Sequence, residues 1–89
     1  MKIKMRGKVW ELVRKRMRLT DGKCDNPTTP SKRIYINSSL KGERELDAII
    51  HELTHAAHWD LAEEAVNEYS TDLARALWRI GYRKQNEKG

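Results

Sequence analysis

Residues 43–59 read ERELDAIIHELTHAAHW, and this stretch decides the fold because apolar residues recur in it at helical spacing. The recurring positions are Leu46, Ile49, Ile50, Leu53 and Ala57. Glu43, Glu45 and Asp47 precede or flank them and suit the positive end of a helix dipole. Because residues three and four apart share one face of a helix, we predict an amphipathic helix over residues 43–59.

The same helix contains His51-Glu52-Leu53-Thr54-His55, which matches the pattern H-E-x-x-H. Residues four apart on a helix lie one turn apart, about 6 Å along the axis, so both imidazoles can reach one zinc ion. Glu52 follows the first histidine directly and can take a proton from zinc-bound water. The sequence therefore predicts a zinc site with His51 and His55 as ligands, pointing away from the core, and Glu52 as the catalytic base. Two surface histidines placed by chance are the alternative.

A second helix is predicted to start at Asp60, as its N-cap, and to stop at Gly81. Its apolar stripe consists of Val66, Tyr69, Leu73, Leu77 and Ile80. The helix offers a third zinc ligand from Glu63, Glu64 or Glu68. Measured from the stripe, Glu63 lies about 90° away, whereas the other two point more nearly to the opposite side. We therefore predict Glu63 as the third ligand, with Glu64 and Glu68 as alternatives.

Other polar residues near this pattern have two interpretations each. Asp72 either holds a ligand imidazole by its second nitrogen or is an exposed helix acid. His58 lies about 10 Å along the helix from His51, so it is a groove or surface residue rather than a ligand. Cys24 either caps the zinc as a thiolate, which would keep an enzyme latent, or is a half-buried loop residue. The candidate donors to an oxyanion are His58, Tyr69 and Tyr35.

The first half of the chain has the patterns of a sheet. Residues 2–8 alternate basic and apolar side chains, which predicts a half-buried strand, and a break in the alternation near Trp10 indicates a bulge or hairpin bend. Residues 20–31 are rich in turn formers and predict a long loop, while residues 33–37 predict a short strand. The expected fold class is α+β: a small antiparallel sheet packed on two C-terminal helices. We expect one domain over residues 1–83 and a polar tail over 84–89.

Length and composition limit the classes of function. A chain of 89 residues buries only about 60 to 65% of its unfolded surface, so an active site would be an open groove. It has no run of about 18 apolar residues to span a membrane and no signal-peptide core, and its one cysteine cannot form an intrachain disulfide. We therefore expect a cytoplasmic protein with no membrane partner.

Charge is distributed unevenly along the chain, and this distribution suggests a second possible function. Residues 1–45 carry 13 Lys and Arg against 5 Asp and Glu, whereas residues 46–89 carry 5 against 8. The basic residues expected to line one sheet face are Lys2, Lys4, Arg6, Lys8, Arg14, Arg16 and Arg18. They would suit nucleic-acid phosphates in a module whose metal site is structural or inactive, or they are simply a solvated face. The leading prediction is a zinc-dependent metallopeptidase that acts on a protein or peptide.

Two resemblances bear on the ligand set. Residues 51–56, HELTHA, resemble the zinc helix of thermolysin-like gluzincins, and residues 67–72, NEYSTD, resemble their N-E-x-x-x-D helix, which implies Glu68 as a ligand. A longer stretch resembles the small zincin-type metallopeptidases encoded by bacteriophages; it matches at residues 22–25, 34–36, 46–56 and 72–82. That resemblance implies Glu63, although Val66 and Tyr69 stand where the related pattern has Ala and Phe. We adopt Glu63 because the second resemblance covers more of the chain.

The longer resemblance also implies a zinc peptidase in the cytosol of a bacterium or a phage-infected host. An open groove can bind an extended peptide as an added strand, and we expect that peptide to lie beside residues 33–37.

Overall fold

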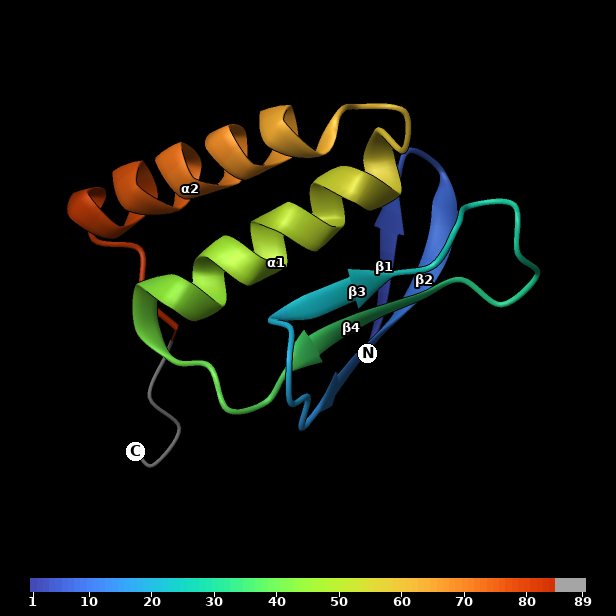
Figure 1. The fold of residues 1–89 in the computed structure, drawn as a ribbon, viewed down its shortest axis with the longest axis horizontal. Coiled ribbons are helices and arrows are strands. Elements are labelled where there is room, and N and C mark those ends of the chain that lie inside the picture. Colours follow the sequence, from blue (N-terminus) through green and yellow to red (C-terminus); the bar gives the residue numbers. More distant parts are fainter. Residues whose placement is uncertain (85–89) are drawn as a thin grey trace.

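The computed structural model describes residues 1–84 and has the α+β architecture that was predicted. Its elements, in chain order, are β1 (Lys2–Met5), β2 (Lys8–Lys15), β3 (Gly22–Cys24), β4 (Arg33–Asn37), α1 (Gly42–Ala57) and α2 (Glu63–Ile80) (Figure 1). Of the predicted tail over 84–89, residues 85–89 lie outside the described residues. None of the helices described is long and apolar enough to cross a membrane.

The sheet is mixed, so the prediction of a purely antiparallel sheet is wrong. Its strand order is β1-β2-β4-β3, with β1 antiparallel to β2, β3 antiparallel to β4, and β2 parallel to β4. The chain leaves β2, passes to the far edge as β3, and returns between the two as β4. An alternating pattern has the same period in parallel and antiparallel strands, so it carries no information about this direction.

The bend predicted near Trp10 lies instead at Arg6 and Gly7, and β2 runs through Trp10 without interruption. Both turn residues have positive φ, 50° and 82°, as a two-residue hairpin turn with the right-handed twist requires. Such a turn pairs Met5 with Lys8 and so moves the core-facing side chains from odd to even positions. The change of phase in the sequence is therefore the consequence of a turn three residues earlier.

The predicted loop over residues 20–31 contains β3, which was missed because three residues are too few to show an alternation. The short strand at 33–37 is confirmed as β4. The second helix ends at Gly81 as predicted, with φ of 114°. The prediction of Asp60 as its cap is wrong, because α2 starts at Glu63 after Ala62 and has no side-chain cap.

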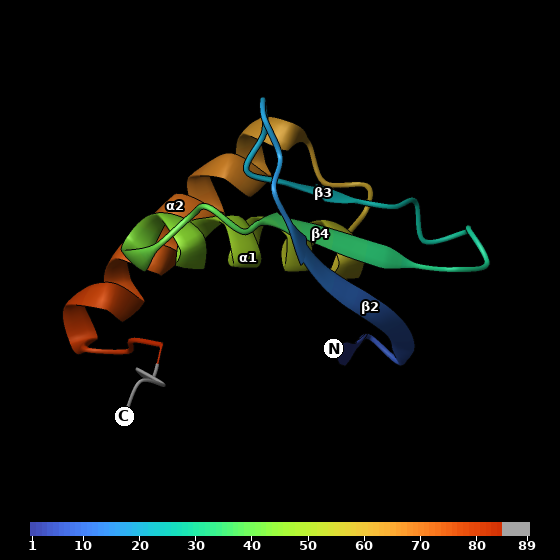
Figure 2. The same ribbon diagram turned by 90° about the horizontal axis from the view of Figure 1, so that it is seen from below.

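The elements form three layers: the sheet, α1 on one face of it, and α2 on the outer side of α1 (Figures 1 and 2). The core between the sheet and α1 consists of Trp10, Leu12, Ile34, Ile36 and Ala56. Strand β4 lies at the centre of this arrangement, with both of its edges paired.

Helix α2 is rotated relative to the predicted apolar stripe. Its buried residues are Val66, Ser70 and Ala74, whereas Tyr69 and Ile80 of the predicted stripe are 55% and 70% exposed. Small side chains let two helices approach closely, so the buried face is defined by size more than by hydropathy. This rotation determines which glutamate of α2 faces α1.

The seven basic residues expected on one sheet face do not share a face in the structure. Register places Lys2 and Lys4 on the face away from α1, but Lys8 and Arg14 on the α1 side. Arg14 pairs there with Glu45, and the turn residue Arg6 donates a hydrogen bond to the carbonyl oxygen of Ala57. Arg16 and Arg18 lie beyond the end of β2. The prediction of a single face is therefore wrong for this set.

Candidate metal centre

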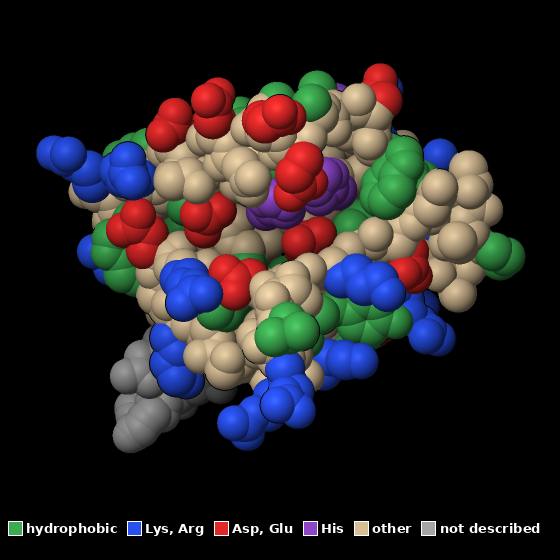
Figure 3. Space-filling model, viewed as in Figure 1, with side chains coloured by type: hydrophobic (Ala, Val, Ile, Leu, Met, Phe, Trp, Pro, Cys, Tyr) green, Lys and Arg blue, Asp and Glu red, His purple; other side chains and the backbone are tan. Residues whose placement is uncertain are grey.

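The three predicted metal ligands converge at one point between α1 and α2. The Nε2 atoms of His51 and His55 are 3.1 Å apart, and the Glu63 carboxylate places Oε2 3.2 Å from the first and Oε1 3.0 Å from the second. These residues form the one group of three potential metal-binding side chains among residues 1–84. In Figure 3, purple histidine side chains are visible on this face of the molecule, with acidic side chains around them.

The rotation of α2 explains why Glu63 is the acid that reaches the histidines. On a helix, Glu63 lies within about 60° of Val66 and about 20° of Ser70, the buried face that packs against α1. Glu64 and Glu68 lie about 100° and 140° around from Glu63, and both are exposed. The geometry therefore favours Glu63 over the ligand that the gluzincin resemblance implies.

The donor set fits a zinc ion. Four-coordinate zinc with bonds of about 2.0 to 2.1 Å separates its ligand atoms by roughly 3.3 Å, close to the separations found here. Two histidines and one glutamate are a donor set of catalytic zinc sites, which leave a fourth position for water. Side-chain exposures of 15% for His51, 17% for His55 and 63% for Glu63 mean that solvent reaches the cluster from the α2 side.

Glu52 lies on the sheet-facing side of α1 and is only 7% exposed. Burial raises the pKa of its carboxyl group to about 7, and the charge of nearby Glu63 adds to the rise; no hydrogen bond from residues 1–84 offsets them. Neighbouring His51 and buried Glu52 thus point to adjoining sides of one helix turn. A carboxyl group with a pKa near 7 is suited to both accept and donate a proton at neutral pH.

Because Gly22 has no side chain, the side chain of Glu52 has room to lie against β3. This glycine was not identified as part of the site from the sequence. A Cβ atom at Gly22 would lie 2.8 Å from Cγ and 2.9 Å from Oε2 of Glu52, and 2.8 Å from the carbonyl oxygen of Tyr35. The glycine was placed in a loop, where its close approach to a residue 30 positions later leaves no local signal. Strand β3 therefore forms one wall of the site.

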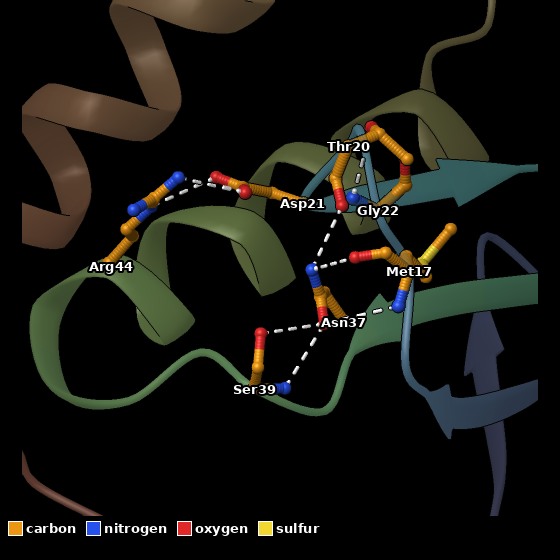
Figure 4. A network of polar contacts seen from close by, with 7 residues as sticks. All are labelled: Met17, Thr20, Asp21, Gly22, Asn37, Ser39 and Arg44. Atoms are coloured by element: carbon orange, nitrogen blue, oxygen red, sulfur yellow. Dashed lines mark hydrogen bonds and ion pairs between the residues drawn. The ribbon is translucent and has the colours of Figure 1, made fainter.

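The segment that leads into β3 is held by the buried side chain of Asn37 (Figure 4). Its Nδ2 donates hydrogen bonds to the carbonyl oxygens of Met17 and Thr20, at 2.8 and 3.1 Å. Its Oδ1 accepts from the backbone N–H of Met17 and from Ser39. One residue further on, Asp21 pairs with Arg44 of α1 at 3.1 Å. These contacts fix the path of the chain immediately before Gly22.

The groove around the donors differs at its two ends. Toward the start of α1 it is lined by polar side chains, including Asp21, Asp47, Asn67 and Thr71. Toward the end of α1 it is lined by Cys24, Trp59 and Leu61. An elongated ligand that crossed the donors would therefore contact polar groups on one side and mainly apolar groups on the other.

The remaining sequence candidates lie apart from the donor cluster. Tyr35 is on the sheet face away from α1, and His58 and Tyr69 line a separate apolar groove, so none of these proposed oxyanion donors lines the walls around His51. Asp72 is exposed, and its neighbour Thr71 instead donates a hydrogen bond to Asp47 at 3.0 Å.

Cys24 lines the groove without joining the three converging donors. Burial raises the pKa of its thiol to about 12, with the charges of Glu52 and Asp25 as further causes. A thiol with this pKa is neutral near pH 7 in the metal-free protein.

Replacing Gly22 with alanine is expected to destabilise the protein by about 1 to 3 kcal/mol, because the added methyl group overpacks the site. The cost should shrink when Glu52 is also alanine, since Cγ and Oε2 are then gone, and urea unfolding of the four proteins of this double-mutant cycle measures the coupling. Equal costs in the two backgrounds would show that Gly22 and Glu52 are independent.

The metal-free protein should lose stability as pH rises through neutrality. The folded chain keeps a proton on Glu52 up to a pKa of about 7, whereas the unfolded chain loses it near 4.5, so rising pH favours unfolding between these values. Above pH 7 the resulting loss in the free energy of unfolding approaches roughly 3 kcal/mol. Urea unfolding in chelator at pH 4 to 8 should show the decline, and Glu52→Gln should remove it while other titrations remain. Parallel curves for the two proteins would contradict the assignment.

Comparison with known proteins finds no family model, curated protein or solved structure that matches this chain.

Proposed function

We propose that this protein is a zinc-dependent metallopeptidase in which His51, His55 and Glu63 hold the metal and Glu52 is the general base. The convergence of three donor side chains at 3.0 to 3.2 Å, one residue away from a buried carboxyl group, carries this proposal. When bound, a zinc ion would supply Lewis acidity that activates water and polarises a substrate carbonyl.

Glu52 moves the proton in this scheme. Its carboxylate accepts a proton from the attacking water and then donates it to the leaving amine nitrogen, and a pKa of about 7 suits both steps near neutral pH. Contact with β3 at Gly22 restricts the side chain, so the carboxyl group is already oriented before substrate binds.

The substrate would be an extended peptide paired with the outer edge of β3. The expected position beside residues 33–37 is wrong, because β2 and β3 occupy both edges of β4. Within residues 1–84, β3 is an edge strand, and it borders the donor cluster. Asp21 and Asp25 bond to β4, so by alternation the backbone groups of Gly22 and Cys24 point to the outer edge. The Thr20 hydroxyl bonds to both backbone groups of Gly22, at 3.0 and 3.4 Å, so a peptide would displace it there. Main-chain bonds to Gly22 and Cys24 would then hold the peptide across the site.

Metal removal tests the proposal directly. The purified protein should contain about one zinc ion per chain and cleave a peptide library; a chelator should abolish cleavage, and added zinc should restore it. A protein that binds zinc but cleaves no peptide would overturn the peptidase assignment, and one that binds no zinc would overturn the metal site as well.

A further inference from the structure

The sheet has one face that no helix covers, here called the open face. Trp10, Leu12, Ile34 and Ile36 point toward α1, so the residues between them in β2 and β4 point the other way. Strand pairing extends this face across all four strands. Figure 2 shows both helices on one side of the sheet, which leaves the other side uncovered by helices.

The open face is strongly basic. Its cationic side chains are Lys2, Lys4, Lys15, Lys23 and Arg33, one or more from every strand. The acid among them, Glu11, is already paired with the N-terminal amino group at 2.7 Å and with Lys2 at 3.7 Å. Arg33 lies between Glu11 and Asp25, whose charges both act on it, whereas Lys4, Lys15 and Lys23 form no ion pair within residues 1–84. The cations outnumber the acids, so the net charge of the face is positive.

The centre of the open face is aromatic and apolar. Tyr35 of β4 lies beside Val13 of β2 in the pairing register. The ammonium group of Lys15 lies 5.2 Å from the centre of the tyrosine ring, and Arg33 lies two residues before Tyr35 in β4, on the same face of the sheet. A stacking surface is thus surrounded by cations from two strands.

We propose that the open face binds single-stranded nucleic acid. Proteins that bind single strands combine cations that follow the phosphates with aromatic rings on which bases stack, and this face contains both. A four-stranded face is too broad for the major groove of a duplex, which admits a helix or a two-stranded ribbon. The face lies on the opposite side of the sheet from the donor cluster, so nucleic-acid binding does not depend on the proposed peptidase activity.

Fluorescence anisotropy with a labelled 12-nucleotide single strand tests this proposal on the full chain. Four phosphate contacts would make affinity fall about fifty-fold between 50 and 200 mM salt. Lys4→Glu combined with Lys23→Glu should weaken binding at least tenfold. The matched control, Arg75→Glu with Arg79→Glu on exposed positions of α2, makes the same charge change and should have a much smaller effect.

Tyr35→Leu should weaken binding about tenfold by removing one stacked base. Lys4→Gln with Lys23→Gln provides a milder pair if the charge reversals disturb folding, which circular dichroism would reveal. Equal losses in the α2 control pair would overturn the proposal, as would binding to a duplex or to vesicles with anionic lipids that equals or exceeds binding to the single strand. Chelator should leave binding unchanged.

Discussion

Glu52→Gln is expected to keep zinc and lose peptide hydrolysis by about 10²- to 10⁴-fold, the range that general-base catalysis contributes. The amide has the shape of the carboxyl group, so it fits the space against Gly22, but it cannot accept the proton of the attacking water. The three proposed metal donors are untouched by the change. Metal analysis and kcat/KM on a cleaved peptide, measured on the same preparation, separate the two properties.

Glu64→Gln is the matched control for this variant. It makes the same chemical change on an exposed position of α2, one residue from the proposed ligand, and should leave both zinc content and kcat/KM close to those of the parent. A Glu52→Gln protein as active as the parent would remove the general base from the mechanism. A protein that loses its zinc would instead assign Glu52 to the metal site.

The features of the site that sequence predicts are those encoded within one helix. His51, Glu52 and His55 are held in place by the 3.6-residue period of α1, and the chain needs no distant contact to set their relative positions. The helix itself was predicted to within two residues at each end. Local periodicity is sufficient here because the motif spans little more than one turn.

Features that depend on contacts between distant segments could not be predicted in the same way. Strand β3 has three residues and is defined by pairing with β4, and the contact of Gly22 with Glu52 joins positions 30 apart. The direction of β4 relative to β2 depends on where the chain crosses, which an alternating pattern does not record. The edge on which a peptide could pair was misplaced for this reason.

The prediction of Glu63 used an apolar stripe that the structure reproduces only in part. Val66 of that stripe is buried and Leu73 and Leu77 are half-buried, but Tyr69 and Ile80 are exposed. The helix buries Ser70 and Ala74 beside Val66 instead. Hydropathy ranks leucine above serine and alanine, whereas close helix packing favours small side chains at the point of contact. The acid was identified by its similarity to short phage-type sequences and by its angle, and the structure supplies a different physical reason for the same residue.

The other large effect is expected on zinc affinity, when the proposed third ligand is replaced. Glu63→Ala should weaken zinc binding more than a hundredfold, because substitution of groups that merely orient ligands already costs 10- to 100-fold. Glu68→Ala should leave affinity nearly unchanged, since Glu68 points about 140° away from Glu63 around α2. Competition with a chromophoric chelator measures both affinities, and His55→Ala serves as the reference for loss of another proposed donor.

This comparison separates two arrangements that the sequence alone leaves open. If Glu68→Ala were the variant that lost zinc, α2 would have to turn by more than a third of a revolution, and Val66 and Ser70 would leave their buried positions against α1. Such a rotation would also lower stability when metal is removed. Loss of zinc in Glu63→Ala alone, with unchanged unfolding of the metal-free protein in both variants, is the result that the packing of α2 requires.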